Sequence, residues 1–402
     1  MLFVASRPAP VAAQIGSFDV AVVGTGVVGL AAALGCAQQG LRVALIGAAP
    51  RQRVPTVEAP FDPRIYALAE ASVRLLEDLR VWPQIDRGRI QPVLRMQIEG
   101  DAGGSLSFDA YAAAVDRLAT IVEEGELLRA LWMACGFASA LSHLDDSFEA
   151  LDPGADAARV RLAGGRALEA RLVLGADGRG SAVRAAAGVN AVETPYEQTA
   201  IVANFACTQP HRGVAHQWFT EEGVVALLPL PGQHVSLVWS APQQLAAGLL
   251  ALGPGELAAR VTARAQGRPG GLTCLGKAYG FALCDLRVES VVAERLALLG
   301  DAAHVVHPLA GQGLNLGLQD VAQLLRVLAA REAWRDPGDL VLLRRHERAR
   351  AEPVGLMRLT VSSLARLFGT QDPAVRWVRN RGLDWVQATP LLKNLLIRRA
   401  MG

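Results

Sequence analysis

Residues 18–29 read FDVAVVGTGVVG, and this stretch decides the fold. Its first half is a short β-branched run that predicts a strand, and residues 30–39 follow with a helix pattern. A second strand pattern at residues 41–46 completes a strand–helix–strand unit with G-x-G-x-x-G at its first turn. The first glycine permits a tight turn, the second lets the backbone approach a pyrophosphate, and the third lets helix and strand pack closely. These glycines are Gly24, Gly26 and Gly29, and they predict a dinucleotide site at a helix N-terminus.

The composition excludes several classes of protein. The chain has 402 residues, of which 51% are apolar and 19% charged, so it is neither disordered nor fibrous and is long enough for two or three domains. Its 40 basic and 38 acidic residues give a net charge of +2, which argues against a nucleic acid as partner. Five widely spaced cysteines without a C-x-x-C pair predict reduced thiols in a cytoplasmic protein.

No stretch of the sequence is expected to cross a membrane or to direct export. Residues 20–41 are uncharged and long enough to span a bilayer, but glycines and two glutamines divide them into a strand and a helix. Residues 1–16 lack an apolar centre, so we expect a flexible leader and not a signal peptide.

Two later motifs specify the nucleotide. Residues 172–181 read LVLGADGRGS, a buried strand that runs into a turn at Asp177 and Gly178. Residues 296–304 read LALLGDAAH and repeat this pattern, and an aspartate at the end of such a strand can accept a hydrogen bond from a ribityl hydroxyl. Residues 311–315 read GQGLN and would present backbone N–H groups at a helix N-terminus, where they suit the negative charge of a reduced flavin. Together with the first motif, these patterns indicate FAD.

The three motifs, in this order, resemble those of the class A flavoprotein aromatic hydroxylases, which have the p-hydroxybenzoate hydroxylase fold. Within that class the chain resembles the ubiquinone-biosynthesis hydroxylases, the UbiH/UbiF/VisC group, from about residue 18 to its end. The most specific match is HPLAGQGLNLGLQD at residues 307–320. The resemblance is also carried by shorter stretches at residues 61–68, 75–82, 196–204, 226–230, 236–240, 390–393 and 400–402.

The resemblance implies an α/β (α+β) fold. A Rossmann-like FAD-binding domain would be joined by an inserted antiparallel sheet that binds substrate and by a C-terminal helical tail. The expected segments are a flexible leader at 1–16, the first parts of the FAD-binding domain at 17–190, the substrate-binding sheet at 191–284, the last part of the FAD-binding domain at 285–350, and a helical region at 351–402.

The motifs and the resemblance together imply which residues hold FAD. Arg64 is expected at the phosphates or the ring edge, and Asp301 at the ribityl chain. Leu314 and Asn315 would offer backbone N–H groups to the pyrimidine edge, and Pro308 would lie against the ring near its oxygen-reactive carbon, so these three form the implied catalytic set. The implied FAD-binding residues are Gly24, Gly26, Val28, Gly29, Arg64, Arg129, Asp177, Gly178, Gly300, Asp301, Gly311, Gln312, Gly313, Leu314 and Asn315.

The chain departs from the family pattern at two positions. A carboxylate that binds the adenosine ribose usually ends the second strand, but Gly47 stands there in this sequence. The adenosine would then be bound more weakly or be supported by backbone groups. The family's Val-Glu-Asn-Arg-like segment reads VEEG at residues 122–125, so Glu124 replaces an asparagine near the flavin.

Other residues that could form a metal site or act as a nucleophile lack the neighbours that such a site requires. His304 and His307 could share a helix face, but no Cys, Asp or Glu cluster accompanies them, and we expect no metal. Ser181 lacks the G-x-S-x-G frame of a nucleophile and is expected to cap a helix that begins near Ala182. Cys274 and Cys284 are expected in the core. A flavin halogenase would need a Trp-x-Trp pair, which the sequence lacks.

The C-terminal tail has a distinct charge. Residues 373–402 contain six basic residues and one acidic residue, and tryptophans and leucines lie between them. This pattern suits attachment to a membrane surface or to a quinone-biosynthesis complex. It suits equally a helix that packs on the domain with a solvated basic face. We therefore expect a cytoplasmic protein, with peripheral attachment to the inner face of the membrane left open.

The resulting hypothesis is FAD-dependent hydroxylation of a polyprenylphenol intermediate of ubiquinone biosynthesis. NAD(P)H would reduce the flavin, and O₂ would form a flavin hydroperoxide that attacks the electron-rich ring. A lipid-tailed phenolic substrate and O₂ are therefore the expected partners. The alternative is a non-catalytic scaffold of the same fold within a quinone-biosynthesis complex. The ring position, the prenyl length and the choice between NADH and NADPH are left open by the sequence.

Overall fold

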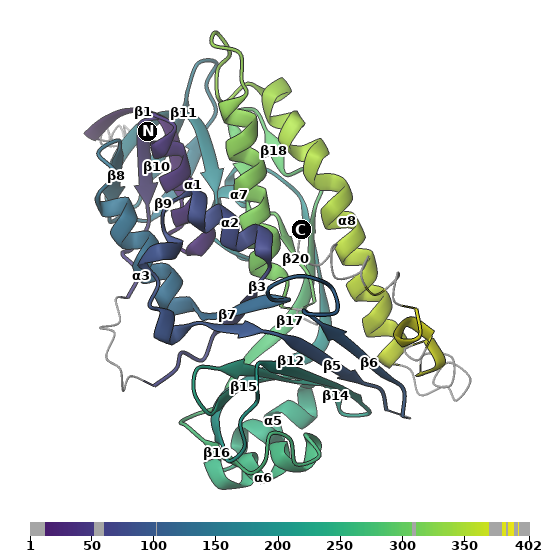
Figure 1. The fold of residues 1–402 in the computed structure, drawn as a ribbon. Coiled ribbons are helices and arrows are strands. Elements are labelled where there is room, and N and C mark those ends of the chain that lie inside the picture. Colours follow the sequence, from purple (N-terminus) through teal and green to yellow (C-terminus); the bar gives the residue numbers. More distant parts are fainter. Residues whose placement is uncertain are drawn as a thin grey trace, which may run out of the picture.

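The computed structural model describes residues 13–51, 60–101, 103–307, 311–369, 380–382, 385–389 and 393. Two large sheets, with helices against them, make up most of this part of the chain (Figure 1). The α/β (α+β) class expected from the sequence is confirmed, because a largely parallel sheet and a largely antiparallel sheet occur with long helices.

The first sheet is built around the strand that precedes the G-x-G-x-x-G turn at residues 24–29. Its strands are β1 (Ala13–Val23), β2 (Val43–Ile46), β8 (Leu141–Leu144), β9 (Phe148–Asp152), β10 (Ala158–Leu162), β11 (Arg166–Gly175), β18 (Val292–Ala293) and β19 (Leu296–Leu298). β1 pairs in parallel with β2 and β11, and β8 and β19 extend the parallel part on either side. Val20 and Val22 pack into one apolar core, and Ala21 and Val23 into another. Burial on both faces explains the nearly continuous apolar pattern of β1.

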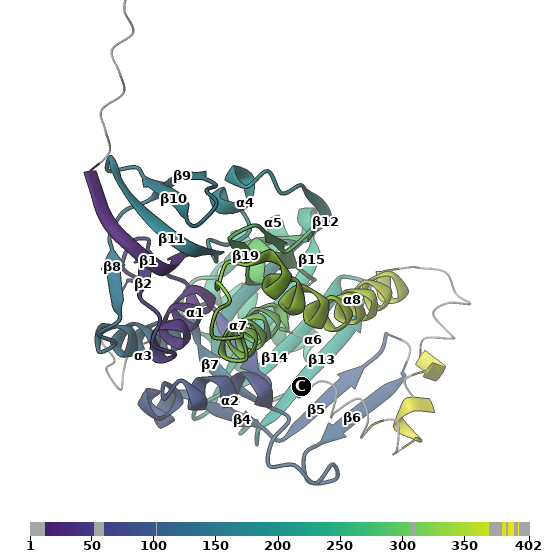
Figure 2. The same ribbon diagram turned by 90° about the horizontal axis from the view of Figure 1, so that it is seen from above.

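Helices cover one face of the first sheet, and the β9–β10 hairpin lies on the other (Figure 2). The covering helices are α1 (Val27–Gln38), α2 (Glu70–Asp78), α3 (Glu124–Gly136) and α7 (Gly313–Ala329). α1 contacts both α3 and α7, and α2 contacts α7. Most of residues 20–41, the long uncharged stretch of the sequence, belong to β1 and α1. None of the helices within the described ranges combines the length and apolar character needed to cross a membrane.

The second sheet has nine strands and is largely antiparallel. They are β5 (Arg95–Glu99), β6 (Ser105–Asp109), β12 (Ala191–Cys207), β13 (Val214–Thr220), β14 (Gly223–Leu230), β15 (His234–Pro242), β16 (Leu272–Cys274), β17 (Tyr279–Val288) and β20 (His304–Val305). β5 joins the sheet by parallel pairing with β13, and β20 pairs with β17. The sheet thus extends beyond the expected 191–284, because two segments distant in sequence supply its edges. Helices α5 (Gln243–Ala251) and α6 (Pro254–Arg264) cover its outer side (Figure 1).

A small sheet and a long helix connect the two large sheets. The small sheet consists of β3 (Ile65–Leu68), β4 (Gln91–Val93) and β7 (Ala119–Glu123). The helix α8 (Leu340–Gly369) packs on α7 and continues to the second sheet, where Val361 and Met357 meet Phe219 of β13 (Figure 1). The remaining short helices of the described ranges are α4 (Ala182–Ala186), η1 (Trp82–Gln84), η2 (Arg87–Arg89) and η3 (Gly300–Ala302).

The five cysteines lie apart from one another as free thiols, as their spacing predicted. Four of them are buried, including Cys284, whereas Cys274 is only half-buried. Burial raises the pKa of Cys36 and of Cys135 to about 12, so neither thiol ionises near neutral pH. These two residues serve as apolar core residues.

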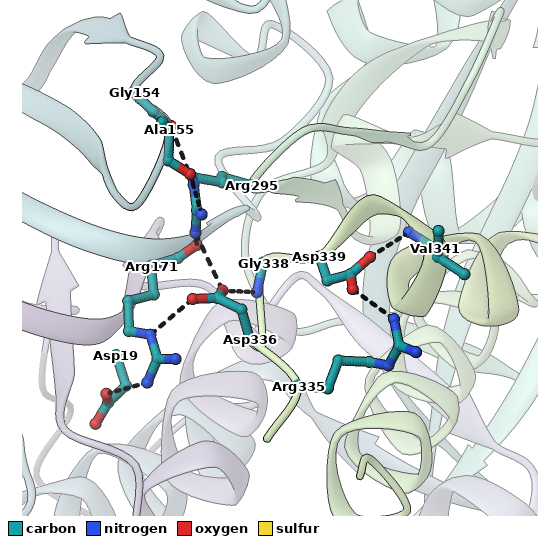
Figure 3. A network of polar contacts seen from close by, with 10 residues as sticks. All are labelled: Asp19, Gly154, Ala155, Arg171, Arg295, Arg335, Asp336, Gly338, Asp339 and Val341. Carbon is teal, nitrogen blue, oxygen red and sulfur yellow. Dashed lines mark hydrogen bonds and ion pairs between the residues drawn. The ribbon is translucent and has the colours of Figure 1, made fainter. Parts of the chain in front are cut away.

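A network of arginines and aspartates joins the first sheet to the loop between α7 and α8 (Figure 3). Asp336 accepts hydrogen bonds from Arg171 Nε at 2.9 Å, from Arg295 Nη1 at 3.0 Å and from the Gly338 backbone at 2.7 Å. The same Arg295 guanidinium donates to the carbonyl oxygens of Ala155 and Arg171. Because Arg295 has only 10% of its side chain exposed, Asp336 is the counterion that makes its burial tolerable.

We predict that Asp336→Ala lowers the free energy of unfolding by about 2–3 kcal/mol, since it leaves the buried Arg295 charge without its partner. Urea denaturation would measure the change. The matched control is Asp152→Ala, which removes an ion pair with Arg161 whose two side chains are 54% and 47% exposed. That control should cost less than about 1 kcal/mol. Equal losses in the two variants would contradict the role assigned to the network.

Buried histidines make the stability of the fold depend on pH. Burial lowers the pKa of His216, His307 and His346 to about 4, whereas an unfolded histidine titrates near 6.5. Below pH 6.5 the unfolded chain therefore binds protons that the folded chain excludes. This contribution to stability is complete above about pH 6.5 and is lost as the pH falls toward 4.

We predict that the urea midpoint of the protein falls between pH 7 and pH 5, and that it falls less in His346→Leu. The leucine removes one group that the fold must keep neutral, and His346 is 1% exposed. Denaturation curves at both pH values would measure the difference. An identical pH dependence in the protein and the variant would exclude His346 as a source of the acid sensitivity.

Candidate active site

A cavity of about 2380 Å³ lies between the two large sheets, and all three sequence motifs contribute to its wall. The predicted residues that line it are Gly24, Gly26, Val28, Arg64, Asp177, Gly178, Asp301, Gly311, Gln312, Gly313 and Leu314. Gly29, Gly300 and Asn315 belong to the same turns but lie behind this wall. Pro308 lies outside the described residues.

The first glycine turn leaves a helix N-terminus open to the cavity. Gly24 has a φ of +116°, and a side chain there would collide with the carbonyl oxygen of Ala176. A side chain at Gly29 would collide with the carbonyl oxygen of Gly24, whereas one at Gly26 would meet nothing within 4 Å. No described side chain caps α1, and its first turn carries no acid. The free N–H groups of this turn can therefore bind an anion from the cavity.

The middle motif forms a turn that its own aspartate stabilises. Asp177 accepts hydrogen bonds from Ser181 Oγ at 2.6 Å and from the backbone of Val183 at 3.1 Å. Gly178 follows with a φ of +82°. Ser181 caps α4 by accepting a hydrogen bond from the Arg184 backbone at 2.9 Å, which confirms its predicted capping role. The Asp177 carboxylate thus holds the turn while the turn itself faces the cavity.

The last motif presents a carboxylate without a partner among the described residues. Gly300 has a φ of +57° and lies against Val28 of α1, so the turn passes close to the first motif. Asp301 follows it and is accessible from the cavity. Burial by surrounding protein raises the pKa of the Asp301 carboxyl, although His304, Arg64 and Arg179 oppose this effect. Such an acid can accept a hydrogen bond from a ligand hydroxyl.

The start of α7 is the second open helix N-terminus of the cavity. No described side chain caps it, its first turn carries no acid, and no described residue accepts a hydrogen bond from the N–H groups of Gly313, Leu314 and Asn315. The Asn315 side chain is buried and fixes this turn from behind. Its Oδ1 accepts from the Ala69 backbone and from Ser72 Oγ, both at 2.8 Å, and its Nδ2 donates to Ala67 at 2.8 Å.

A cluster of three side chains projects into the cavity from the small sheet and its neighbours. Arg64 Nη1 lies 3.3 Å from Glu124 Oε1, and Tyr66 Oη donates to the same oxygen at 3.0 Å. Burial opposes the charge of Arg64, but Glu124 and Tyr66 outweigh it and raise the pKa of the guanidinium. Glu124, the departure noted in the sequence, thus provides the counterion that orients Arg64 in this cavity.

Arg129, which is also predicted to bind FAD, has protein groups as its partners in this structure. Its guanidinium donates to the Gln84 carbonyl at 2.8 Å and to Glu126 at 2.9 Å, and it does not line the cavity. Arg129 lies on α3, the helix that packs on α1 behind the nucleotide turn. Its place in the sequence could not reveal which face of that helix it occupies.

The two histidines beside the last motif have separate partners. His304 Nε2 lies 2.7 Å from Asp320, and His307 Nε2 lies 2.9 Å from Gln198 Oε1. No group of three potential metal ligands occurs among the described residues.

Sequence reasoning missed a buried network behind the last motif. Asp320 of α7 accepts hydrogen bonds from the Gly300 backbone at 3.0 Å, from His304 at 2.7 Å and from Arg350 Nε at 2.6 Å. Burial would raise the pKa of the Asp320 carboxyl, but His304 and Arg350 lower it to about 2. The only sequence signal was an acid at a core position of an otherwise apolar helix face.

Sequence reasoning also missed the contribution of α8 and the segment after it to the cavity wall. Leu356, Met357, Val361 and Leu364 line it from α8, and Trp385 lines it from beyond. Their apolar spacing alone gave no sign of which surface α8 would cover.

These residues fit an elongated dinucleotide with a ring system. Two uncapped helix N-termini face one cavity and suit phosphates and an anionic ring. The carboxylate of Asp301, which has no hydrogen-bond partner among the described residues, lines the same cavity and can bind a polyol chain. The fold and the site therefore define a flavin-dependent oxidoreductase that binds FAD.

Comparisons with known proteins agree with this assignment. Residues 17–354 match the FAD binding domain family. The ubiquinone hydroxylase UbiL of Rhodospirillum rubrum is 36% identical over 388 residues, which cover 96% of this chain and 89% of that protein. The 3-demethoxyubiquinol 3-hydroxylase of Escherichia coli is 34% identical over 389 residues, which cover 96% of this chain and 98% of that protein. A structure of p-nitrophenol 4-monooxygenase PnpA from Pseudomonas putida shares the fold, with a TM-score of 0.77, 17% identity, and coverage of 96% of this chain and 99% of that one.

The chain belongs to the FAD binding domain family and, within it, to the FAD-dependent hydroxylases of ubiquinone biosynthesis. The resemblance drawn from the sequence motifs is thus confirmed, as are FAD as the cofactor and a monooxygenase activity.

We predict that Asp301→Ala raises the dissociation constant for FAD about 10- to 100-fold, because a charged hydrogen-bond acceptor in the cavity is lost. Titration of the apoprotein followed by flavin fluorescence would measure it. Asp301→Asn keeps the shape and one acceptor oxygen and should lose less affinity. If both variants bind FAD as the unmodified protein does, Asp301 does not contact the cofactor.

Proposed function

We propose that the protein hydroxylates the aromatic ring of a polyprenylated phenol, an intermediate of ubiquinone biosynthesis, with NAD(P)H as reductant and O₂ as oxidant. One oxygen atom enters a ring C–H bond, the other leaves as water, and NAD(P)H is oxidised. Bound FAD supplies the chemistry of oxygen activation. The names of the two bacterial relatives support a quinone precursor as the substrate class.

The observation that carries the proposal is the apolar continuation of the cavity beyond the three motifs. Strands β5, β13 and β14 of the second sheet face α8 across it. We call this part the apolar arm; its residues are Ile98, Phe219, Val224, Met357, Val361 and Leu364. Phe219 and Val361 are already buried, but Ile98, Val224, Met357 and Leu364 are only half-buried. A prenyl chain would bury more of their apolar surface than a phenol without a tail could.

The protein's own residues would then bind the cofactor, orient the substrate and shield the reacting ring from water. The free N–H groups at the start of α7 stabilise negative charge on the ring system of the cofactor. Asn315 keeps that turn rigid through its three hydrogen bonds to residues 67–72. The second sheet covers the cavity and limits access of water to the reacting ring. This division of labour explains why the site needs no paired acid and base.

Exposed apolar residues at the cavity support delivery of a lipid-tailed substrate from a membrane surface or a quinone-biosynthesis complex. Leu356 is 42% exposed and Trp385 is 65% exposed, and both line the cavity. The basic tail at residues 373–402 follows in sequence, although most of it lies outside the described residues. Peripheral attachment of a cytoplasmic protein to the inner face of the membrane is part of this proposal.

The test compares a prenylated phenol with the same phenol lacking its tail. FAD-loaded protein should oxidise NADH or NADPH and release hydroxylated product with the prenylated phenol. Val224→Trp, which fills the apolar arm, should raise KM for the prenylated phenol about tenfold and leave the tailless phenol unaffected. Product analysis by mass spectrometry and initial rates would measure both effects.

The matched control is Val341→Trp, the same substitution at a position on α8 that is 59% exposed and outside the cavity wall. It should leave both KM values unchanged. A protein that binds FAD but turns over neither phenol, even with its partners present, would favour the non-catalytic scaffold. Equal KM changes for both phenols in Val224→Trp would contradict the apolar arm as the tail site.

A further inference from the structure

The position after β2 cannot easily hold the acidic residue that usually binds the adenosine ribose. Gly47 has a φ of +143°, where any other residue is strained. A side chain built there would approach Thr25 Cγ2 to 3.1 Å. His143 Nε2 donates to the Gly47 carbonyl at 2.8 Å, which ties this backbone to the neighbouring strand. The ribose must therefore find its partners on another element.

The neighbouring turn supplies candidates at the same edge of the sheet. β8 pairs in parallel with β2, with Ile46 opposite Leu144, and the Gly47 N–H donates to Leu144 O at 3.2 Å. The chain then turns from β8 into β9 beside Gly47. Residues 146–148 of this turn line the cavity together with Thr25 and Gly47. With the pyrophosphate of FAD bound at the free N–H groups of the first glycine turn, this edge would face the adenosine half of the dinucleotide.

The three residues of the turn differ in what they can offer. Asp146 is engaged: it accepts from the backbones of Ser147 and Gly164 at 2.8 and 3.0 Å and pairs with Arg166 at 2.9 Å. These contacts fix the turn. The Ser147 hydroxyl is exposed to the cavity, and no described residue hydrogen-bonds to it. Phe148 is half-buried: it packs against the apolar core that contains Val160, and it also lines the cavity.

We propose that the β8–β9 turn, and not an acid after β2, binds the adenosine of FAD, with Phe148 against the adenine ring and the Ser147 hydroxyl toward the ribose. Asp146 is a positioning residue that holds the turn. An aromatic face suits any base, and a hydroxyl can donate to and accept from a ribose hydroxyl. The inference rests on FAD as the cofactor and concerns only the affinity of its adenosine half.

The experiment measures binding of FAD and of ADP to the apoprotein, because ADP carries the adenosine and pyrophosphate without the flavin. Phe148→Ala should raise both dissociation constants about tenfold, and Ser147→Ala about fivefold. At saturating FAD both variants should keep the flavin absorbance spectrum of the unmodified protein. A merely structural role would instead lower Tm and change the spectrum.

The matched control is Glu149→Ala, the next residue of β9, which is exposed and absent from the cavity wall. It should leave both dissociation constants unchanged. Values within twofold of the unmodified protein for Phe148→Ala and Ser147→Ala would overturn the proposal, as would a loss of affinity confined to Glu58→Gln, the nearest acid after β2 in sequence. Failure of the unmodified protein to bind FAD at all would instead contradict the FAD assignment itself.

Discussion

The arrangement of the site depends on the hydrogen bonds that the buried carboxylate of Asp320 accepts. This carboxylate receives the backbone N–H of Gly300, the ring of His304 and the guanidinium of Arg350, and so joins the last motif, α7 and α8 at one point. Arg350 also donates to Leu316 O at 3.2 Å, near the start of α7. An ionised group without water must have all of its partners in place. The Gly-Asp turn and the open end of α7 are therefore held in one fixed relation, and a cofactor that touches both meets a site formed in advance.

The cavity changes character along its length. At one end it is bounded by backbone turns rich in glycine. There the backbone N–H groups, and not the side chains, are available to bind a ligand. At the other end the side chains of the second sheet and α8 that bound it are mostly apolar, and polar side chains such as Gln217, Ser236 and Thr360 lie among them. Arg64, Tyr66 and Glu124 lie in its wall with the motif residues. The first end suits charge and polyol groups, and the second presents mainly apolar area with a few polar side chains.

The structural features that could be predicted from the sequence are those that depend on residues close together in the chain. Gly24, Gly26 and Gly29 are required by a turn and a helix start a few residues apart, so their roles were readable from spacing. The cap at Ser181 is equally local. By contrast, the pairing of β5 with β13 joins residues more than a hundred positions apart, and no local pattern encodes it. The partners of Arg129, the Gln84 carbonyl and Glu126, were unreadable for the same reason, because a helix pattern does not say which neighbour each face will meet.

The β5–β6 hairpin has a consequence for how such a chain can evolve. It leaves the small sheet after β4, completes the edge of the second sheet, and returns to the small sheet at β7. The second sheet is thus assembled from two separate inserts in the FAD-binding framework, with β20 of the framework at its edge, and cannot be exchanged as a single cassette between relatives. A new substrate range must arise by substitution within the existing strands, or by coordinated change in both inserts. The interleaved chain path therefore favours gradual change of the apolar arm over replacement of the sheet as a module.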